Sequence, residues 1–213
     1  MILRYERKYF LSEYMTEIIK RRASALMRPD SHSNGVYRVC NIYFDDVYNS
    51  FYHDKHRGAY TRSKWRLRWY NDDISFMRLE RKLKEGHLVS KESVLVNEDN
   101  YNILRAGRIE EIFETDGIWN EFALIHRLRP LRPAVMFTYH REAYVLDTAD
   151  TRLTFDTDIA SPARIPDIME LKYTHFLPDH VREIFSGLPM VQTEMSKYCE
   201  AVDFKNVNTR ATY

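Results

Sequence analysis

The chain has 213 residues, 44% of them hydrophobic, which is enough to bury a substantial core in one large domain. Lysine and arginine number 32 and aspartate and glutamate 31, so the formal net charge is +1. A chain this close to neutrality lacks the broad basic field that holds a nucleic acid backbone. Nucleic acid is therefore not an expected partner, and any cationic site must be created by local geometry.

Cysteines and apolar runs indicate the cellular setting. No segment has the length of apolar sequence needed to span a membrane, and the N-terminal residues lack a secretory hydrophobic region. Neither Cys40 nor Cys199 lies near a second cysteine or a histidine pair at metal-ligand spacing. These features predict reduced thiols and a cytoplasmic location, with no membrane span in this chain. A separate membrane partner is left open.

Hydrophobic periodicity predicts a β-rich chain interrupted by helices. Ser12 is suited to cap the first helix, Gly107 ends the second, and proline at position 178 opens a later one. In chain order the expected elements are a strand over 2–10, a helix over 12–27, strands over 36–44, 64–70, 76–83 and 88–95, helices over 97–107 and 118–128, strands over 134–146, 152–159 and 167–173, and helices over 178–187 and 193–204.

Three consecutive strands near the middle of the chain place cations at every second residue. Successive strand side chains point to opposite faces, so Arg66 and Arg68 share one face, and Glu80 and Lys82 fall together by the same count. The opposite face of the first strand holds Trp65, Leu67 and Trp69. Like charges across a sheet repel each other, so the arrangement predicts that the sheet surrounds a polyanion. Tryptophans directed away from the arginines also disfavour a stacking platform for single-stranded nucleic acid.

About eight short strands, joined as antiparallel neighbours, predict a mainly β fold of the α+β class. An eight-stranded closed sheet can enclose a small ligand. The expected architecture is a closed antiparallel eight-stranded tunnel barrel with flanking helices, formed by a single domain over residues 1–213. Its interior is expected to be charged and lined with uncompensated cations.

Seven short motifs occur in an order that resembles the VTC domain, the polyphosphate polymerase branch of the CYTH-like triphosphate tunnel metalloenzymes. The resemblance extends from residue 4 to about residue 204. It is carried by Glu6-Arg-Lys8, Arg66-Leu-Arg68, Leu79-Glu-Arg-Lys82, Lys91, Tyr139-His-Arg141, Glu170-Leu-Lys172 and Ser196-Lys-Tyr198. The resemblance implies a tunnel whose interior basic residues bind a triphosphate and whose acidic residues hold a divalent cation.

The resemblance assigns roles to residues of this chain. Arginine forks match phosphate oxygens and lysines supply point charges. The expected catalytic residues are Lys8, Arg66, Arg68, Lys82, Lys91 and Arg141. The expected substrate-binding residues are Tyr139, Arg152, Lys172, Ser196 and Lys197. Glu170, with Glu6 as a weaker candidate, is expected to bind Mn²⁺ or Mg²⁺.

The predicted reaction is ATP-dependent polyphosphate synthesis, in which the γ-phosphate of ATP is transferred to a growing chain and ADP is released. The expected partners are ATP and polyphosphate, or another triphosphate. The wider superfamily opens with Glu-x-Glu-x-Lys, whereas this chain has Arg4 at the first acidic position, which favours the polymerase branch over a hydrolytic one. A metal-dependent tunnel triphosphatase and a noncatalytic polyphosphate- or nucleotide-binding module remain as alternatives.

Overall fold

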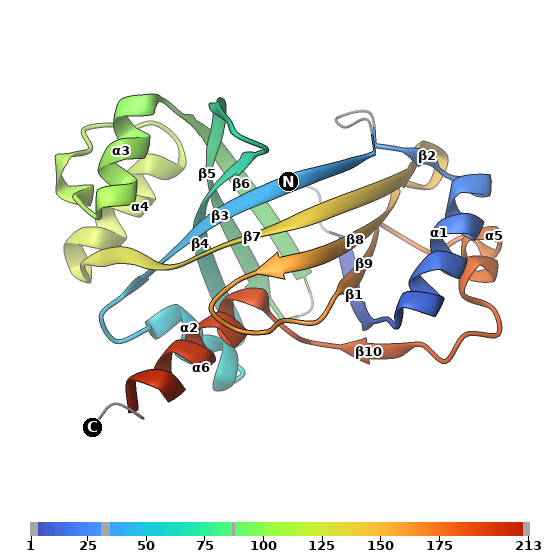
Figure 1. The fold of residues 1–213 in the computed structure, drawn as a ribbon. Coiled ribbons are helices and arrows are strands. Elements are labelled where there is room, and N and C mark those ends of the chain that lie inside the picture. The colour runs from blue at the N-terminus through green and yellow to red at the C-terminus, as the bar shows by residue number, and fades with distance from the viewer. Residues whose placement is uncertain (1–3, 31–34, 87, 211–213) are drawn as a thin grey trace.

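The computed structural model describes residues 4–30, 35–86 and 88–210 (Figure 1). The strands are β1 (Tyr5–Phe10), β2 (Arg28–Pro29), β3 (Val36–Asp46), β4 (Thr61–Tyr70), β5 (Asp73–Glu85), β6 (Leu88–Val96), β7 (Leu131–Leu146), β8 (Thr151–Ala160), β9 (Ile168–Tyr173) and β10 (Val191–Thr193). The helices are α1 (Glu13–Leu26), α2 (Ser50–His56), α3 (Glu98–Ala106), α4 (Ile118–Leu128), α5 (Asp179–Arg182) and α6 (Lys197–Arg210). Short 3-10 turns are η1 (Ile109–Glu111), η2 (Asp147–Ala149) and η3 (Glu183–Phe185).

All of the strands belong to one antiparallel sheet with the order β10-β1-β9-β8-β7-β3-β4-β5-β6, and β2 pairs with β7. The mainly β prediction is confirmed, but an eight-stranded closed barrel is not. Within the described residues the sheet has ten strands. Between β1 and β6, the described residues form a single isolated bridge, from Arg4 to Val89, in place of a continuous ladder.

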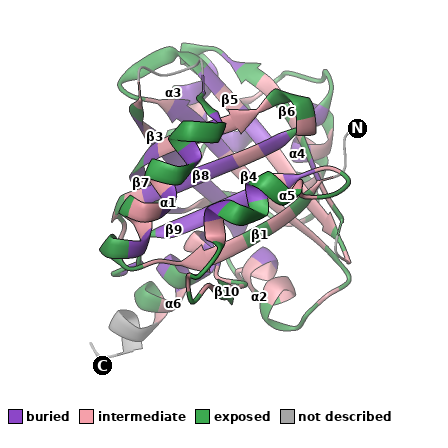
Figure 2. Ribbon diagram, turned by 90° about the vertical axis from the view of Figure 1, so that its right-hand side faces the viewer, coloured by how far each residue is buried: buried purple, intermediate pink, exposed green. Residues whose placement is uncertain are grey.

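Helices cover the outer face of the sheet in two separate groups. Trp65 and Leu67 of β4 lie in a buried cluster with Phe122 of α4 and Leu104 of α3. A second cluster joins α1, α5 and η3 to the outer faces of β8 and β9. Figure 2 shows α1 and α5 lying across these strands, with their outer surfaces exposed. Because both apolar faces point outward to helices, the opposite face of the sheet is left for polar side chains.

Helix α6 packs on the inner face of the sheet, against β3 and β7. Its residues Tyr198 and Cys199 are buried against β3 and β7, and the Tyr198 ring stacks on Tyr43 with 5.1 Å between centroids. Tyr43 stacks in turn on Phe137 at 5.4 Å. One region of the inner face is therefore apolar and filled by α6, while the region beyond the start of α6 is charged.

Several boundaries differ from the sequence prediction. The last helix begins at Lys197 and not near 193, because residues 191–193 pair with β1 as β10 and the Ser196 hydroxyl accepts from the Cys199 amide at 3.4 Å. Helix α2 is absent from the elements expected from the sequence. Its first turn is held by Asp45, whose carboxylate accepts from the Phe51 amide at 3.1 Å, a contact that sequence periodicity does not reveal.

Within the described residues, each helix is too short or too polar to cross a membrane.

Candidate functional site

Strand alternation places the predicted cationic residues on the inner face of the sheet. The register sets Arg66 opposite Glu80, Lys82 opposite Lys91 and Arg141 opposite Asp156. On the neighbouring strands, β1 and β9 bring Glu6 opposite Lys172 and Lys8 opposite Glu170. The shared parity that the sequence predicted for Arg66, Arg68, Glu80 and Lys82 is therefore present, and the charges gather in two clusters.

The arginine cluster consists of Arg66, Arg68, Glu80 and Lys91. The Glu80 side chain is 1% exposed, and its carboxylate accepts from Arg66 Nε at 2.7 Å and from Lys91 Nζ at 3.0 Å. Arg68 Nη1 lies 3.9 Å from the same carboxylate. Burial alone would raise the pKa of Glu80, but Arg66, Arg68 and Lys91 outweigh it and hold that pKa well below its usual range. Glu80 is therefore an anion that holds the arginines in place.

Tyr43 borders the arginine cluster, and the charges of that cluster shift the pKa of its phenol. Arg66 Nη1 donates to the Tyr43 hydroxyl at 2.9 Å, and the guanidinium lies over the ring. Burial raises the pKa of the Tyr43 phenol, whereas Arg66, Arg68 and Lys64 lower it more, to about 8. Sequence reasoning did not identify Tyr43. Tyr43 lies two residues after Asn41 in β3, so strand alternation places both on the inner face, where Asn41 accepts from Arg68 Nε.

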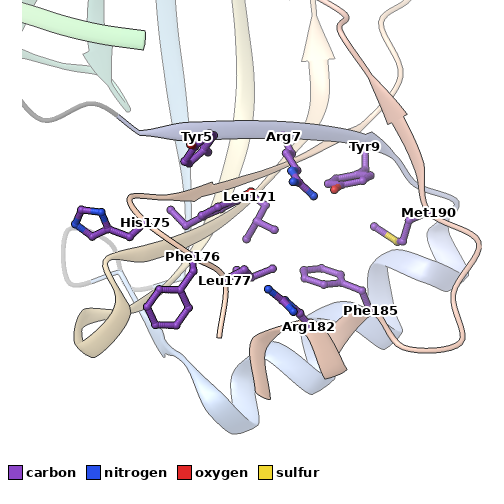
Figure 3. A pocket seen from close by; sticks show the side chains of 11 residues that line it. Tyr5, Arg7, Tyr9, Leu171, His175, Phe176, Leu177, Arg182, Phe185 and Met190 are labelled. Atoms are coloured by element: carbon purple, nitrogen blue, oxygen red, sulfur yellow. The ribbon is translucent and has the colours of Figure 1, made fainter. Parts of the chain in front are cut away.

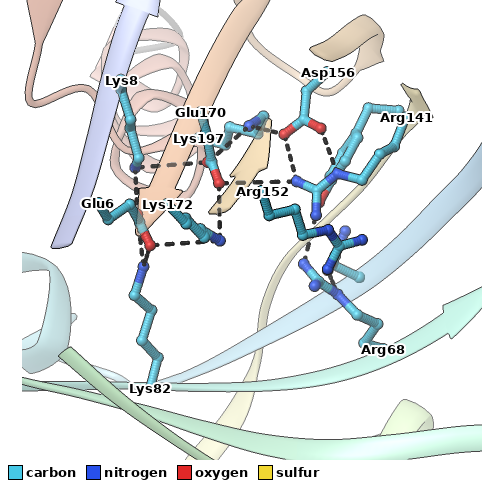
Figure 4. Close-up of polar contacts among 12 residues, drawn as sticks. Glu6, Lys8, Arg68, Lys82, Arg141, Arg152, Asp156, Glu170, Lys172 and Lys197 are labelled. Carbon is cyan, nitrogen blue, oxygen red and sulfur yellow. Dashed lines mark hydrogen bonds and ion pairs between the residues drawn. The ribbon is translucent and has the colours of Figure 1, made fainter. Parts of the chain in front are cut away.

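The lysine cluster consists of Glu6, Lys8, Lys82, Glu170 and Lys172 (Figure 4). Lys82 Nζ lies 2.8 Å from both oxygens of Glu6. Lys172 Nζ bridges the two carboxylates, 3.5 Å from Glu6 and 3.2 Å from Glu170. Lys8 does the same at 3.6 Å and 4.0 Å. Burial raises the pKa of both acids, but these lysines outweigh it and hold both pKa values far below the usual range.

Arg141, Lys197 and Tyr139 connect the two clusters. Asp156, fully buried, accepts from Arg141 Nε at 2.6 Å and from Lys197 Nζ at 2.6 Å. Lys197 Nζ also lies 3.7 Å from Glu170. Tyr139 lies beneath both cations and accepts from Arg68 Nη2 at 3.1 Å. One continuous network thus runs from Lys82 to Arg66 across the inner face.

Arg152 and Ser196 have other neighbours. Arg152 lies opposite Lys172 in the register of β8 and β9, pairs with Asp30 at 2.5 Å and donates to the Tyr37 hydroxyl at 3.2 Å. The Ser196 hydroxyl accepts from Lys64 Nζ at 2.6 Å. Lys64 was not among the predicted site residues, although it shares the parity of Arg66, which is the signal that would have identified it.

The expectation of uncompensated cations was wrong, because buried carboxylates accompany them. In the described chain, the arginine cluster still has three cations for one carboxylate. Two further inner-face atoms, Asn41 Nδ2 and Thr154 Oγ1, are buried and have no hydrogen-bond partner among the described residues. Buried polar groups are normally paired, so these atoms indicate that the network receives additional polar partners.

The donor chemistry of Glu6 and Glu170 fits a hard divalent cation only with help from a ligand. The described residues contain no group of three or more histidine, cysteine or acidic side chains placed to hold a metal ion. Mg²⁺ is commonly bound by one or two carboxylates together with substrate phosphates. Glu6 and Glu170 share Lys8 and Lys172 as neighbours and so face the same space, which satisfies the protein's part of such a site.

The antiparallel sheet carries a buried network of cations on its inner face, an arrangement suited to binding a polyanion. The sequence profile of the VTC domain matches residues 3–205, and the chain belongs to this family. A search of curated proteins gave no match.

Solved structures share the fold at low sequence identity. A Bacillus halodurans protein named "putative adenylate cyclase" is 15% identical with a TM-score of 0.55, and the alignment covers 92% of this chain and 95% of that one. The PH1819 protein of Pyrococcus horikoshii is 14% identical with a TM-score of 0.54, covering 96% and 98%. A Vibrio parahaemolyticus protein, also named "putative adenylate cyclase", is 7% identical with a TM-score of 0.53, covering 96% and 98%. These similarities concern the fold alone.

Proposed function

We propose that the protein is an ATP-dependent polyphosphate polymerase that transfers the γ-phosphate of ATP to a growing polyphosphate chain. The observation that carries the proposal is the buried network of cations on the inner face, in which arginine forks and lysines converge from six strands and α6. Membership of the VTC domain family supports a phosphotransferase or triphosphatase. We treat residues 1–213 as one tunnel domain.

In this proposal, the arginine cluster binds the phosphate groups of the substrate. Arg66 and Arg68 present guanidinium forks that match phosphate oxygens bidentately. Glu80 fixes them in advance, so little side-chain entropy is lost on binding. Phosphoryl transfer needs positioning and charge stabilisation more than covalent chemistry, and preorganised cations provide both.

The lysine cluster supplies point charges along the phosphate path and the metal ligands. Lys8, Lys82 and Lys172 line this side, while Glu170 and Glu6 would hold Mg²⁺ or Mn²⁺ together with phosphate oxygens. Such an ion would act as a Lewis acid on the phosphoryl oxygens. The protein's own contribution is to orient the triphosphate between Lys197 and Arg141.

Arg4 favours the polymerase over the triphosphatase. Its guanidinium pairs with Asp150 at 2.7 Å in a partly exposed position, and Glu6 is the carboxylate that β1 places opposite Lys172 on the inner face. A hydrolase of this superfamily would use two first-strand carboxylates. The triphosphatase remains a second candidate because Glu6 and Glu170 face one space and together could position a metal-bound water.

The test is to incubate the purified protein with ATP and Mn²⁺ and to separate the products on a polyphosphate gel. Long chains and ADP support the polymerase, whereas free phosphate alone supports the triphosphatase. Binding of ATP without any turnover would indicate a noncatalytic module. Arg127→Ala, on the exposed surface of α4, is the matched control for changes at Arg66.

The proposed setting is the cytoplasm, where Cys40 and Cys199 would remain reduced. Both cysteines are free and buried. ATP and polyphosphate are the proposed partners, and a separate membrane protein could receive the product.

A further inference from the structure

A hollow lies on the outer face of β1 and β9, on the side of these strands that faces away from the cationic network. Its volume is about 580 Å³, within the range of small-molecule sites. The lining comes from the two strands, the loop after β9, α5 and η3 (Figure 3). Strand alternation separates this hollow from the tunnel, because Tyr5, Arg7 and Tyr9 point outward while Glu6 and Lys8 point inward.

The floor of the hollow is apolar and its rim is aromatic. Leu171, Phe185 and Met190 form part of the lower lining and pack against the core beneath α1. Tyr5 stacks on Tyr173 with 5.3 Å between ring centroids and remains 48% exposed. Phe176 is 69% exposed at the rim. Large aromatic surfaces left in contact with solvent beside a hollow favour a planar ligand that stacks on them.

The charge of the lining is positive. Arg7 and Arg182 flank the hollow from β1 and α5, on opposite sides in Figure 3, and His175 lies at its edge. Among the described residues that line the hollow, none is acidic. Arg182 pairs at 3.2 Å with Asp179, which is 94% exposed, and a pair this exposed contributes little and leaves the guanidinium able to exchange partners.

Arg7 is the second arginine of the hollow, and its observed contact is with an aromatic ring. Its guanidinium lies 5.7 Å from the centroid of the Tyr173 ring. Within the described part of the chain, it forms no ion pair with a carboxylate. A cation–π contact does not use the N–H donors of a guanidinium, so a phosphate can accept hydrogen bonds from them.

We propose that this outer hollow binds a nucleotide, with the base stacked on the Tyr5 and Phe176 rings and the phosphate held by Arg7 and Arg182. The combination of aromatic faces, an apolar floor and acid-free cations matches a planar base linked to a phosphate. An inorganic phosphate would use only the arginines, and an acidic lipid would use the arginines and the floor without the rings. The site is separate from the tunnel and does not depend on the polymerase proposal.

The test is calorimetric titration of the full chain with AMP, first without tripolyphosphate to measure the affinities and then with tripolyphosphate added. We expect one AMP site that binds ribose 5-phosphate at least about fivefold more weakly, since base stacking contributes about 1–3 kcal/mol. Arg7→Gln and Arg182→Gln should each weaken AMP about tenfold, and Phe176→Ser about fivefold. The control Arg127→Gln should leave AMP affinity unchanged.

Four outcomes would overturn the proposal. The first is AMP affinity that is unchanged in Arg7→Gln. The second is inorganic phosphate or ribose 5-phosphate competing as well as AMP, which would show a simple anion site. The third is binding to vesicles that contain acidic phospholipid, without binding to AMP, which would indicate a lipid headgroup. The fourth is complete loss of AMP binding when tripolyphosphate is added, with wild-type AMP affinity in Arg7→Gln, which would place the nucleotide in the tunnel.

Discussion

The two charge clusters of the inner face differ in how many anions accompany their cations. The arginine cluster gathers Arg66, Arg68 and Lys91 around the single buried carboxylate of Glu80. In the lysine cluster, Glu6 and Glu170 share the cations that lie between them. An excess of fixed guanidinium groups suits the binding of phosphate. A pair of carboxylates that share their lysine partners suits the exchange of a lysine for a metal ion. We therefore assign phosphate binding to the arginine cluster and metal binding to the lysine cluster, and each assignment can be tested.

Arg66→Ala should produce the largest effect. Loss of a preorganised donor is expected to lower polymer synthesis on the order of 10²- to 10³-fold. The substitution should also destabilise the protein by about 1–3 kcal/mol, less than the 3–5 kcal/mol typical of a broken buried pair, because Lys91 and Arg68 still face Glu80. Gel assays and urea unfolding measure the two effects.

The double variant Arg66→Ala, Glu80→Ala separates the effect on activity from the effect on stability. Removing Glu80 as well leaves Arg68 and Lys91 without their shared carboxylate, so the double variant should be less stable than Arg66→Ala while its activity is equally low. Full activity in Arg66→Ala alone would move the grip away from the arginine cluster.

Glu170→Gln should separate metal use from phosphate binding. The amide keeps the shape of the side chain but removes the anion that lies between Lys172 and Lys197. Metal-dependent turnover should therefore be lost, while tripolyphosphate measured in EDTA should bind on the order of tenfold more tightly, about 1–2 kcal/mol for the removal of one nearby repulsive charge. Calorimetry with and without Mn²⁺ tests both parts.

Substantial turnover in Glu170→Gln at ordinary Mn²⁺ concentrations would instead make Glu170 an ion-pair partner of Lys172. The metal assignment would then pass to Glu6.

Tripolyphosphate should raise the melting temperature. At a hundredfold excess over the dissociation constant, binding contributes about 2.7 kcal/mol, which corresponds to about 5–10 °C for a chain of this size. The shift should be lost in Arg66→Ala and kept in Arg127→Ala. An equal shift with chloride at the same ionic strength would mean that the anion only screens the clusters.

The smallest effect concerns pH. Burial lowers the pKa of Lys82 to about 8, with Glu6 opposing that change, and Tyr43 also has a pKa of about 8. Above pH 8, Lys82 loses its positive charge and Tyr43 gains a negative one, so both changes should weaken tripolyphosphate binding. Affinity measured from pH 7 to 9 should fall severalfold, and Lys82→Met combined with Tyr43→Phe should flatten the profile.

The same two groups predict the opposite trend for stability. In the unfolded chain both groups titrate at higher pH, near 10, so between pH 8 and 10 the unfolded state binds more protons than the folded state. The ligand-free protein should therefore become more stable as pH rises through this window, as far as these two groups decide. A fall in unfolding free energy across it, abolished by the double variant, would contradict the assigned pKa values.

The sequence by itself determined the local pattern. Alternation placed Arg66, Arg68, Glu80 and Lys82 on one face because a strand repeats every two residues, whatever its partners. The same rule gave the outward direction of Trp65 and Trp69, and Ser12 identified the start of the first helix. Ordered motifs identified the VTC domain family, which no periodicity could have done.

Only the tertiary structure decided how the charges are balanced and where α6 packs. The partnership of Glu80 with Lys91 depends on strand register, and that of Asp156 with Lys197 depends on α6 returning from the far end of the chain. Helix α2 depends on capping by Asp45 from a preceding strand. These contacts join residues that are separated in the sequence, and their free energies arise from burial and distance, which exist only after the chain has folded.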